Sequence, residues 1–177
     1  MASEHVPPCY VDKLLLPARI MLPGPEQLTG SFALSASSPV RDGPESLVEL
    51  LNSGARVLPV IRSNDDAVML LSRLSIDSVE VGADVQPAWV RPQNFVVTRE
   101  ELILVRLLDG RRLEGRVSIE LPEHLNRVSD FLNLAEDFFA LATRSCTMLI
   151  NKSRVSVVRL YGHSPSPVAH GSESGSP

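Results

Sequence analysis

Apolar and polar side chains alternate strictly between residues 112 and 121. One set comprises Leu113, Gly115, Val117, Ile119 and Leu121, and the other comprises Arg112, Glu114, Arg116, Ser118 and Glu120. This alternation is typical of a β-strand that turns one face to a core and the other to solvent. A nearly continuous apolar run over 102–108 precedes it, and Asp109-Gly110 between the two favours a tight turn. The pattern predicts an antiparallel hairpin.

Two short helices are predicted from a longer period between apolar positions. After Pro122, which ends the strand above, the spacing of apolar residues becomes i, i+3, i+4 and i+7. The positions are Val128, Phe131, Leu132 and Ala135, and the same spacing occurs earlier at Leu47, Leu50, Leu51 and Gly54. Pro44 suits the first turn of the earlier helix. Asn52 and Asn133 are expected to end the two helices in the left-handed conformation, which asparagine tolerates.

Similar segments occur twice in the chain, in the same order. The matching pairs are 28–34 with 113–119, 50–52 with 131–133, and 70–73 with 149–152, at offsets of 85, 81 and 79 residues. A conserved order with slowly shrinking offsets favours a tandem duplication with loop deletions. The alternative is two unrelated segments that share a strand-rich apolar pattern.

The repeat predicts a mainly β fold built from two tandem small β-barrel units of the Sm-like or SH3-like kind. Each unit has about five strands, with a short helix inserted after the second strand. Closure is expected because a small flat sheet would leave one face wet. The expected boundaries are an N-terminal extension 1–12, unit one 13–82, a linker 83–98, unit two 99–161 and a disordered tail 162–177. Further strands are expected at 56–62, 68–72 and 76–81, and at 138–143, 147–151 and 155–160.

Pro59 falls inside one of these predicted strands. Proline has no N–H to donate to a ladder, so Pro59 is expected at a sheet edge or a bulge.

Composition narrows the range of functions. A formal net charge of −4 argues against a protein that grips a polyanion, because phosphate binding relies on clustered Lys and Arg. Cys9 and Cys146 have neither a metal-type spacing nor the pattern of a disulfide framework. No apolar run approaches the roughly 18 residues that span a bilayer, and residues 1–8 do not have the pattern of an export signal. We expect a cytoplasmic protein with no cofactor and no metal site.

Two stretches of unit two resemble a known family. The segment 107–117 (LLDGRRLEGRV) resembles the first signature of Sm-like proteins, and 150–158 (INKSRVSVV) is similar to their second signature. It departs from the second signature at Asn151-Lys152, where those proteins usually have Arg-Gly. The segment 127–133 (RVSDFLN) is closer still to a motif of an uncharacterised bacterial family. Sm-like proteins bind RNA and lack this mid-barrel helix, so the resemblance implies the barrel fold more than the activity.

Few residues carry recognisable chemistry. No nucleophile elbow, zincin motif, phosphate-binding glycine loop or paired-cysteine motif occurs. His124 follows Pro122 without a supporting triad and is interpreted as a solvated loop residue. The basic residues that could contact a partner or an anion are Arg111, Arg112, Arg116 and Arg127. Trp89 in the linker could contact a partner, although a linker tryptophan more often covers a core.

The sequence therefore favours a non-enzymatic protein-interaction, scaffold or adaptor module of a bacterial cytoplasmic complex. Paired small β units present strand edges on which a protein partner or a second copy can add a strand. The alternative is an Sm-like RNA or nucleotide binder that uses the unit-two arginines, although nucleic acid is the less favoured partner. An enzymatic site at an interface stays open only because a sequence does not reveal such sites.

Overall fold

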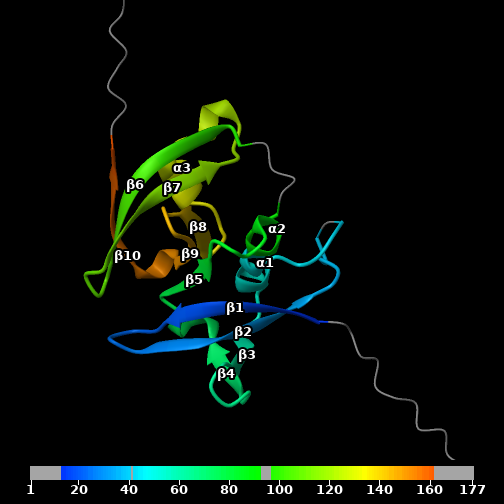
Figure 1. Cartoon of the computed structure of the whole chain (residues 1–177). Helices are drawn as coiled ribbons and strands as arrows, with labels where there is room; N and C mark the ends of the chain where they lie inside the picture. Colours follow the sequence, from blue (N-terminus) through cyan, green and yellow to red (C-terminus); the bar gives the residue numbers. More distant parts are fainter. Residues whose placement is uncertain (1–12, 41, 93–96, 162–177) are drawn as a thin grey trace, which may run out of the picture.

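The computed structural model describes residues 13–40, 42–92 and 97–161. Its strands are β1 (Lys13–Met21), β2 (Gln27–Ser35), β3 (Val57–Arg62), β4 (Val68–Ser72), β5 (Ser78–Gly82), β6 (Arg99–Leu107), β7 (Arg112–Ile119), β8 (Phe138–Ala142), β9 (Cys146–Asn151) and β10 (Val155–Leu160). Its α-helices are α1 (Leu47–Asn52), α2 (Pro87–Val90) and α3 (Val128–Leu132), and its 3-10 turns are Arg73–Ser75, Glu123–Leu125 and Lys152–Arg154. The mainly β class is as predicted (Figure 1). The predicted extension 1–12 and tail 162–177 lie outside the described residues.

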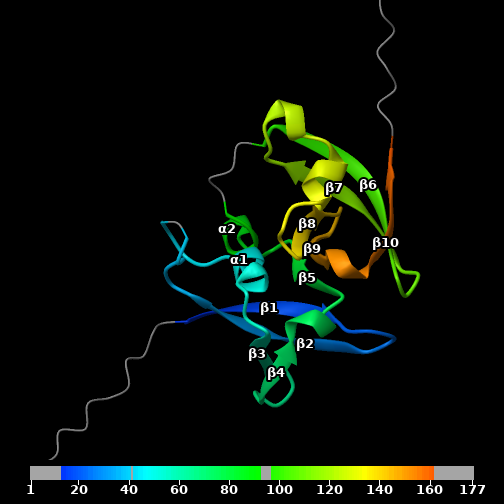
Figure 2. The same cartoon turned by 180° about the vertical axis from the view of Figure 1, so that it is seen from behind.

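The described strands form one antiparallel sheet in the order β10-β6-β7-β8-β9-β5-β1-β2-β3-β4. The order β5-β1-β2-β3-β4 in residues 13–82, here called the first half, recurs as β10-β6-β7-β8-β9 in residues 99–161, the second half. The repeated order agrees with the matching segments. Figure 2 shows β5, β8 and β9 lying between the β1–β2 hairpin and the β6–β7 hairpin.

Closure into two separate barrels is not observed. The fourth strand of the second half, β9, pairs with β5 of the first half, and the sheet stays open with β4 and β10 as its two ends. A strand can satisfy its outer backbone groups on any neighbouring edge, and here the neighbour belongs to the other half of the chain.

Gly30 in β2 and Gly115 in β7 occupy the same place in the two halves. A Cβ on Gly30 would lie 2.6 Å from the carbonyl oxygen of Ile61, and one on Gly115 would lie 2.5 Å from the carbonyl oxygen of Ala142. Each glycine therefore lets the third strand of its half pack directly onto the second strand. The matching segments 28–34 and 113–119 thus share the same requirement, a residue without a Cβ at the point where the next strand packs.

The helices start and end differently from the prediction. Ser46 caps α1 in a capping box with Glu49, so Pro44 lies two residues before the cap and not in the first turn. Neither asparagine adopts the left-handed conformation: Asn133 has a φ of −87°, and among the described residues Asp66 alone has a positive φ without being a glycine. After α1 the positive φ, of 41°, falls on Gly54, because glycine has no Cβ to resist it.

Pro59 lies in β3, which is an interior strand and not an edge. The registered pairing of β3 with β2 ends at Phe32↔Val60, so β2 needs no donor at Pro59. On the other side Pro59 faces Leu70 of β4. Hydrogen bonds to β4 run through Arg62 and Arg56, three residues away in each direction, which turns the Pro59 nitrogen away from β4.

The predicted linker contains a helical turn. Trp89 lies in α2, half-buried, and packs on the core of the first half, in agreement with the covering role. Residues 93–96 of this segment lie outside the described ranges. No helix among the described residues is long and apolar enough to cross a membrane.

Gly115→Ala is expected to destabilise the protein by about 2 kcal/mol, because a methyl group would collide with the backbone of β8. Gly82→Ala is the control. Its methyl group would meet only the carboxylate of Asp84, which can rotate away, so we expect a loss below about 1 kcal/mol. Chemical denaturation of both variants measures the difference, and equal losses would contradict the close-packing account.

Candidate interaction surfaces

The two halves meet where β5 pairs with β9. The register runs from Ser78↔Ile150 to Gly82↔Cys146 in an unbroken antiparallel ladder. Asn151 extends the contact, because its backbone N–H donates to the carbonyl of Asp77 and its side-chain amide donates to the carbonyl of Ile76 at 2.9 Å. We call this contact the junction.

Apolar side chains from the second half complete the core of the first half. Phe138 and Leu149 are buried in the cluster formed by the first half, while their neighbours Phe139 and Ile150 are buried in the cluster of the second half. The alternation of side chains along a strand explains this division, since β8 and β9 lie between two cores. The junction is therefore a continuous hydrophobic contact as well as a ladder.

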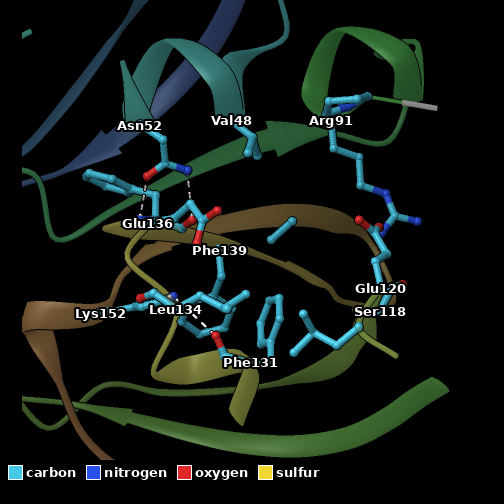
Figure 3. Close-up of a pocket in the computed structure, with 14 residues that line it drawn as sticks. Val48, Asn52, Arg91, Ser118, Glu120, Phe131, Leu134, Glu136, Phe139 and Lys152 are labelled. Carbon is cyan, nitrogen blue, oxygen red and sulfur yellow. Dashed lines mark hydrogen bonds between the residues drawn. The ribbon is translucent and has the colours of Figure 1, made fainter. Parts of the chain in front are cut away.

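Asn52, the last residue of α1, bridges the junction with two hydrogen bonds. Its side-chain amide donates to the carbonyl of Phe138 at 3.0 Å, and its side-chain oxygen accepts from the N–H of Phe138 at 2.9 Å (Figure 3). The amide thus satisfies both backbone groups of one residue at the start of β8, as a neighbouring strand would. Sequence reasoning placed Asn52 at the helix end but missed this contact.

Ion pairs lie at the end of the junction where Ser78 faces Ile150. Buried Asp77 lies 3.0 Å from the Arg111 guanidinium and 3.1 Å from that of Arg154. Burial raises the pKa of Asp77, and the two guanidinium groups oppose that shift. At the same end of the ladder Arg73 pairs with Asp137, and it also donates to the carbonyl of Leu51 in the last turn of α1.

The four arginines predicted as contact residues do not share one role. Arg111 is held by Asp77 and Asp109 at the junction. Arg112 and Arg116 are exposed along β7, and Arg127 is exposed at the start of α3. Of the four, Arg116 alone lines one of the two cavities described below.

The first cavity, of about 280 Å³, lies between α1, α3, the C-terminal end of α2 and strands β7 and β8 (Figure 3). Its walls are mostly apolar, with an edge-to-face contact between Phe131 and Phe139. Lys152 donates to the carbonyls of Phe131 and Leu134 and is thus engaged by its own half. The pKa of Glu120 is raised to about 7, because the effect of burial outweighs the opposing effect of the nearby Arg91 guanidinium. Figure 3 shows Glu136 at the opposite end of the cavity from Glu120.

The second cavity, also about 280 Å³, carries positive charge. It lies between β5, α2, β7, β8 and the start of β9, and its lining contains Arg91, Arg116 and Arg144 together with Thr143 and Ser145. No acidic residue is among its lining residues. Guanidinium and hydroxyl groups are the donors that suit an anion.

Other chemistry-bearing residues are isolated. His124 is exposed in the turn Glu123–Leu125, and Cys146 is a free thiol beside the hydroxyl of Thr143. In the described ranges no group of three His, Cys, Asp or Glu residues could hold a metal ion. His5, His163, His170 and Cys9 lie outside the described residues.

The two ends of the sheet expose apolar side chains. Along β4 the side chains of Val68 and Leu70 are 64% and 72% exposed, and Val57 beside them in β3 is 48% exposed. At the other end, Leu160 of β10 is 54% exposed. The register turns the backbone groups of Val68 and Leu70 away from β3, because the hydrogen bonds to β3 pass through alternate residues. Within the described ranges both ends therefore present strand backbone without a partner strand, together with apolar surface.

Comparison of the chain with protein-family models, with curated proteins and with solved structures finds no match. The resemblance to Sm-like proteins stays a prediction.

Asn52→Ala is expected to reduce the free energy of unfolding by about 2 to 3 kcal/mol, because it leaves the buried N–H and carbonyl of Phe138 without partners. Asn133→Ala is the matched control. Asn133 ends the equivalent helix, but its side chain has no hydrogen-bond partner in the part of the chain described. We expect a change within about 0.5 kcal/mol in dilute protein. Denaturant unfolding measures the free energy of unfolding of both variants. Equal decreases in the two variants would refute the bridging role of Asn52.

Proposed function

We propose that the protein is a non-enzymatic interaction module, of the scaffold or adaptor kind, that works in a bacterial cytoplasmic complex. It binds protein chains by adding strands to its two free edges, β4 and β10. The observation that carries this proposal is that, in the part of the chain that the structure describes, strand backbone without a partner coincides with exposed apolar side chains at both ends of the sheet.

Edge strands of proteins that stay alone are normally protected by charged residues, by proline or by a covering segment. The outward positions of β4 are Val68, Leu70 and Ser72, so neither charged residues nor proline protect this edge. Burial of an exposed Val or Leu side chain contributes about 1.5–3 kcal/mol. Added main-chain hydrogen bonds would make such an edge a site for strand addition.

Leu70→Lys tests this function, with Leu125→Lys as its matched control. Leu125 is 46% exposed in the turn Glu123–Leu125, away from both edges, and neither change should unfold the protein because both sites lie on the surface. The full-length protein is used as bait for cell extract. We expect wild type and Leu125→Lys to retain protein chains at high salt, further copies of this chain included. Leu70→Lys should retain at least about tenfold less.

Retention that is equal in the two variants, or no retained protein at all, would contradict the use of the β4 edge. Salt is varied because an apolar edge contact persists in high salt, whereas a contact between exposed charges weakens.

A second candidate function is anion or nucleotide binding in the cavity that contains Arg91, Arg116 and Arg144. The absence of acidic side chains from its lining favours this candidate. It corresponds to the Sm-like RNA or nucleotide binder of the sequence analysis, although Arg116 is the one predicted arginine involved.

If this candidate is correct, ATP or a short RNA should bind with an affinity that falls as salt rises. Arg116→Gln should weaken binding by about tenfold, whereas Arg112→Gln, on the same strand but outside the cavity lining, should not. Calorimetric titration measures both. Equal effects of the two variants, or no binding at low salt, would remove the candidate.

A further inference from the structure

We infer that the chain bound at each free edge is a second copy of this protein, with β10 of one copy paired to β4 of the next. The inference rests on the proposed function and names its partner. Its basis is the repeated architecture. The junction joins the last strand of the first half to the fourth strand of the second half, and their counterparts β10 and β4 each have one side without a strand partner among the described residues.

The repeat fixes the register of this contact. The equivalent of β9 in the first half is β4, and the equivalent of β5 in the second half is β10, both at an offset of 79 residues. The junction pairs Val79↔Leu149 and Val81↔Thr147. Between copies the corresponding pairs are Val158↔Leu70 and Leu160↔Val68. These are the outward residues of β4, whose backbone groups are free for a ladder.

Residues that are buried at the junction have equivalents that are exposed at or near the ends of the sheet. Phe138 and Leu149, which are 2% and 0% exposed, lie buried at the junction, whereas their equivalents in the first half are Val57 and Leu70, at 48% and 72%. Val81 is buried in β5, whereas its equivalent Leu160 is 54% exposed. Each of these junction residues has an exposed apolar counterpart, in β4, in β10 or in β3 next to β4. A second copy would bury all of them as the junction does.

The side chain of Asn133 gives a second reason to expect a contact between copies. Asn52 crosses the junction to both backbone groups of Phe138. Its equivalent Asn133 has no side-chain hydrogen bond among the described residues. The equivalent of Phe138 is Val57, which lies beyond the end of the β2–β3 pairing. Between copies, Asn133 of one would bridge to Val57 of the next.

The ion pairs of the junction are not repeated. The equivalents of Arg73 and Asp137 are Lys152 and Arg56, which carry the same sign. The equivalent of Asp77 is Ser156, so its pairs with Arg111 and Arg154 have no counterpart either. The contact between copies is therefore apolar and weaker than the junction, and a single substitution, Arg56→Asp, restores one missing ion pair.

The contact is head-to-tail, because its two surfaces differ. β4 and β10 lie at opposite ends of the sheet and far apart in both views (Figures 1 and 2). A heterologous contact of this kind produces a closed ring or an open chain of copies.

Light scattering of the purified full-length protein tests the inference. At about 100 µM, well above a micromolar dissociation constant, we expect a mass that is a multiple of the 19.3 kDa chain mass. Leu70→Lys should abolish assembly, Asn133→Ala should weaken it about tenfold, and Arg56→Asp should strengthen it about fivefold. The controls are Leu125→Lys and Arg56→Lys, which should assemble as wild type does.

A mass of 19.3 kDa at every concentration, or assembly unaffected by Leu70→Lys, would overturn the inference. Loss of assembly on Arg56→Asp would also contradict the register. The proposed function is judged separately by the bait measurement: a protein that is monomeric but retains other chains through β4 keeps the function and loses this inference. A monomer with no edge-dependent retention loses both.

Discussion

The pairing of β5 with β9 is the contact on which the rest of the molecule depends. It joins the two halves into one sheet, and it brings Phe138 and Leu149 into a core to which their own half contributes no other strand. Neither half closes on itself, since the fourth and last strands of each half are not paired with each other in the described sheet. Asn52 and the ion pairs of Asp77 and Arg73 support this contact at one end of the ladder, where Ser78 faces Ile150.

A repeated unit that satisfies its edge on a neighbouring unit has a structural consequence. Each added unit covers one edge and presents another, so a chain with two units still has two uncovered ends. Natural proteins tolerate such ends when a partner covers them or when charged residues protect them. Here β4 and β10 carry apolar residues at positions whose equivalents are buried at the junction. The free edges therefore have the composition of an interface.

The sequence predicts the local elements well and their long-range pairing poorly. Alternation around Gly115 and the Asp109-Gly110 turn define the β6–β7 hairpin because both signals are local. The repeat offsets likewise anticipate the strand order. Which edge β9 would join is a tertiary choice that no local pattern contains, and the expectation of two closed barrels failed there. The four-residue helix α2 is too short to leave a period.

The candidate surfaces show the same division. The four predicted contact arginines do not form one site, because Arg111 is held by Asp77, 34 residues away in sequence, and Arg116 alone of the four lines a cavity. Asn52 and Asn133 look alike in sequence, and one crosses the junction while the other is free of side-chain hydrogen bonds within the described chain. The two asparagines are separated by the same offset as the starts of β3 and β8, the strands that follow them, so they occupy equivalent places in the repeat. Equivalent residues are expected to have equivalent partners. This equivalence identifies a partner only once the contacts of the junction are known.

Amide hydrogen exchange as a function of protein concentration tests the central claim, that the sheet ends are interaction edges, most directly. The amides of Val68 and Leu70 point away from β3 and should exchange quickly in dilute protein. The account predicts that they become protected as concentration rises, together with outward amides of β10, while Thr147 and Leu149 in the equivalent strand β9 are protected throughout. Rapid exchange of the β4 amides at every concentration and in the presence of cell extract would contradict it.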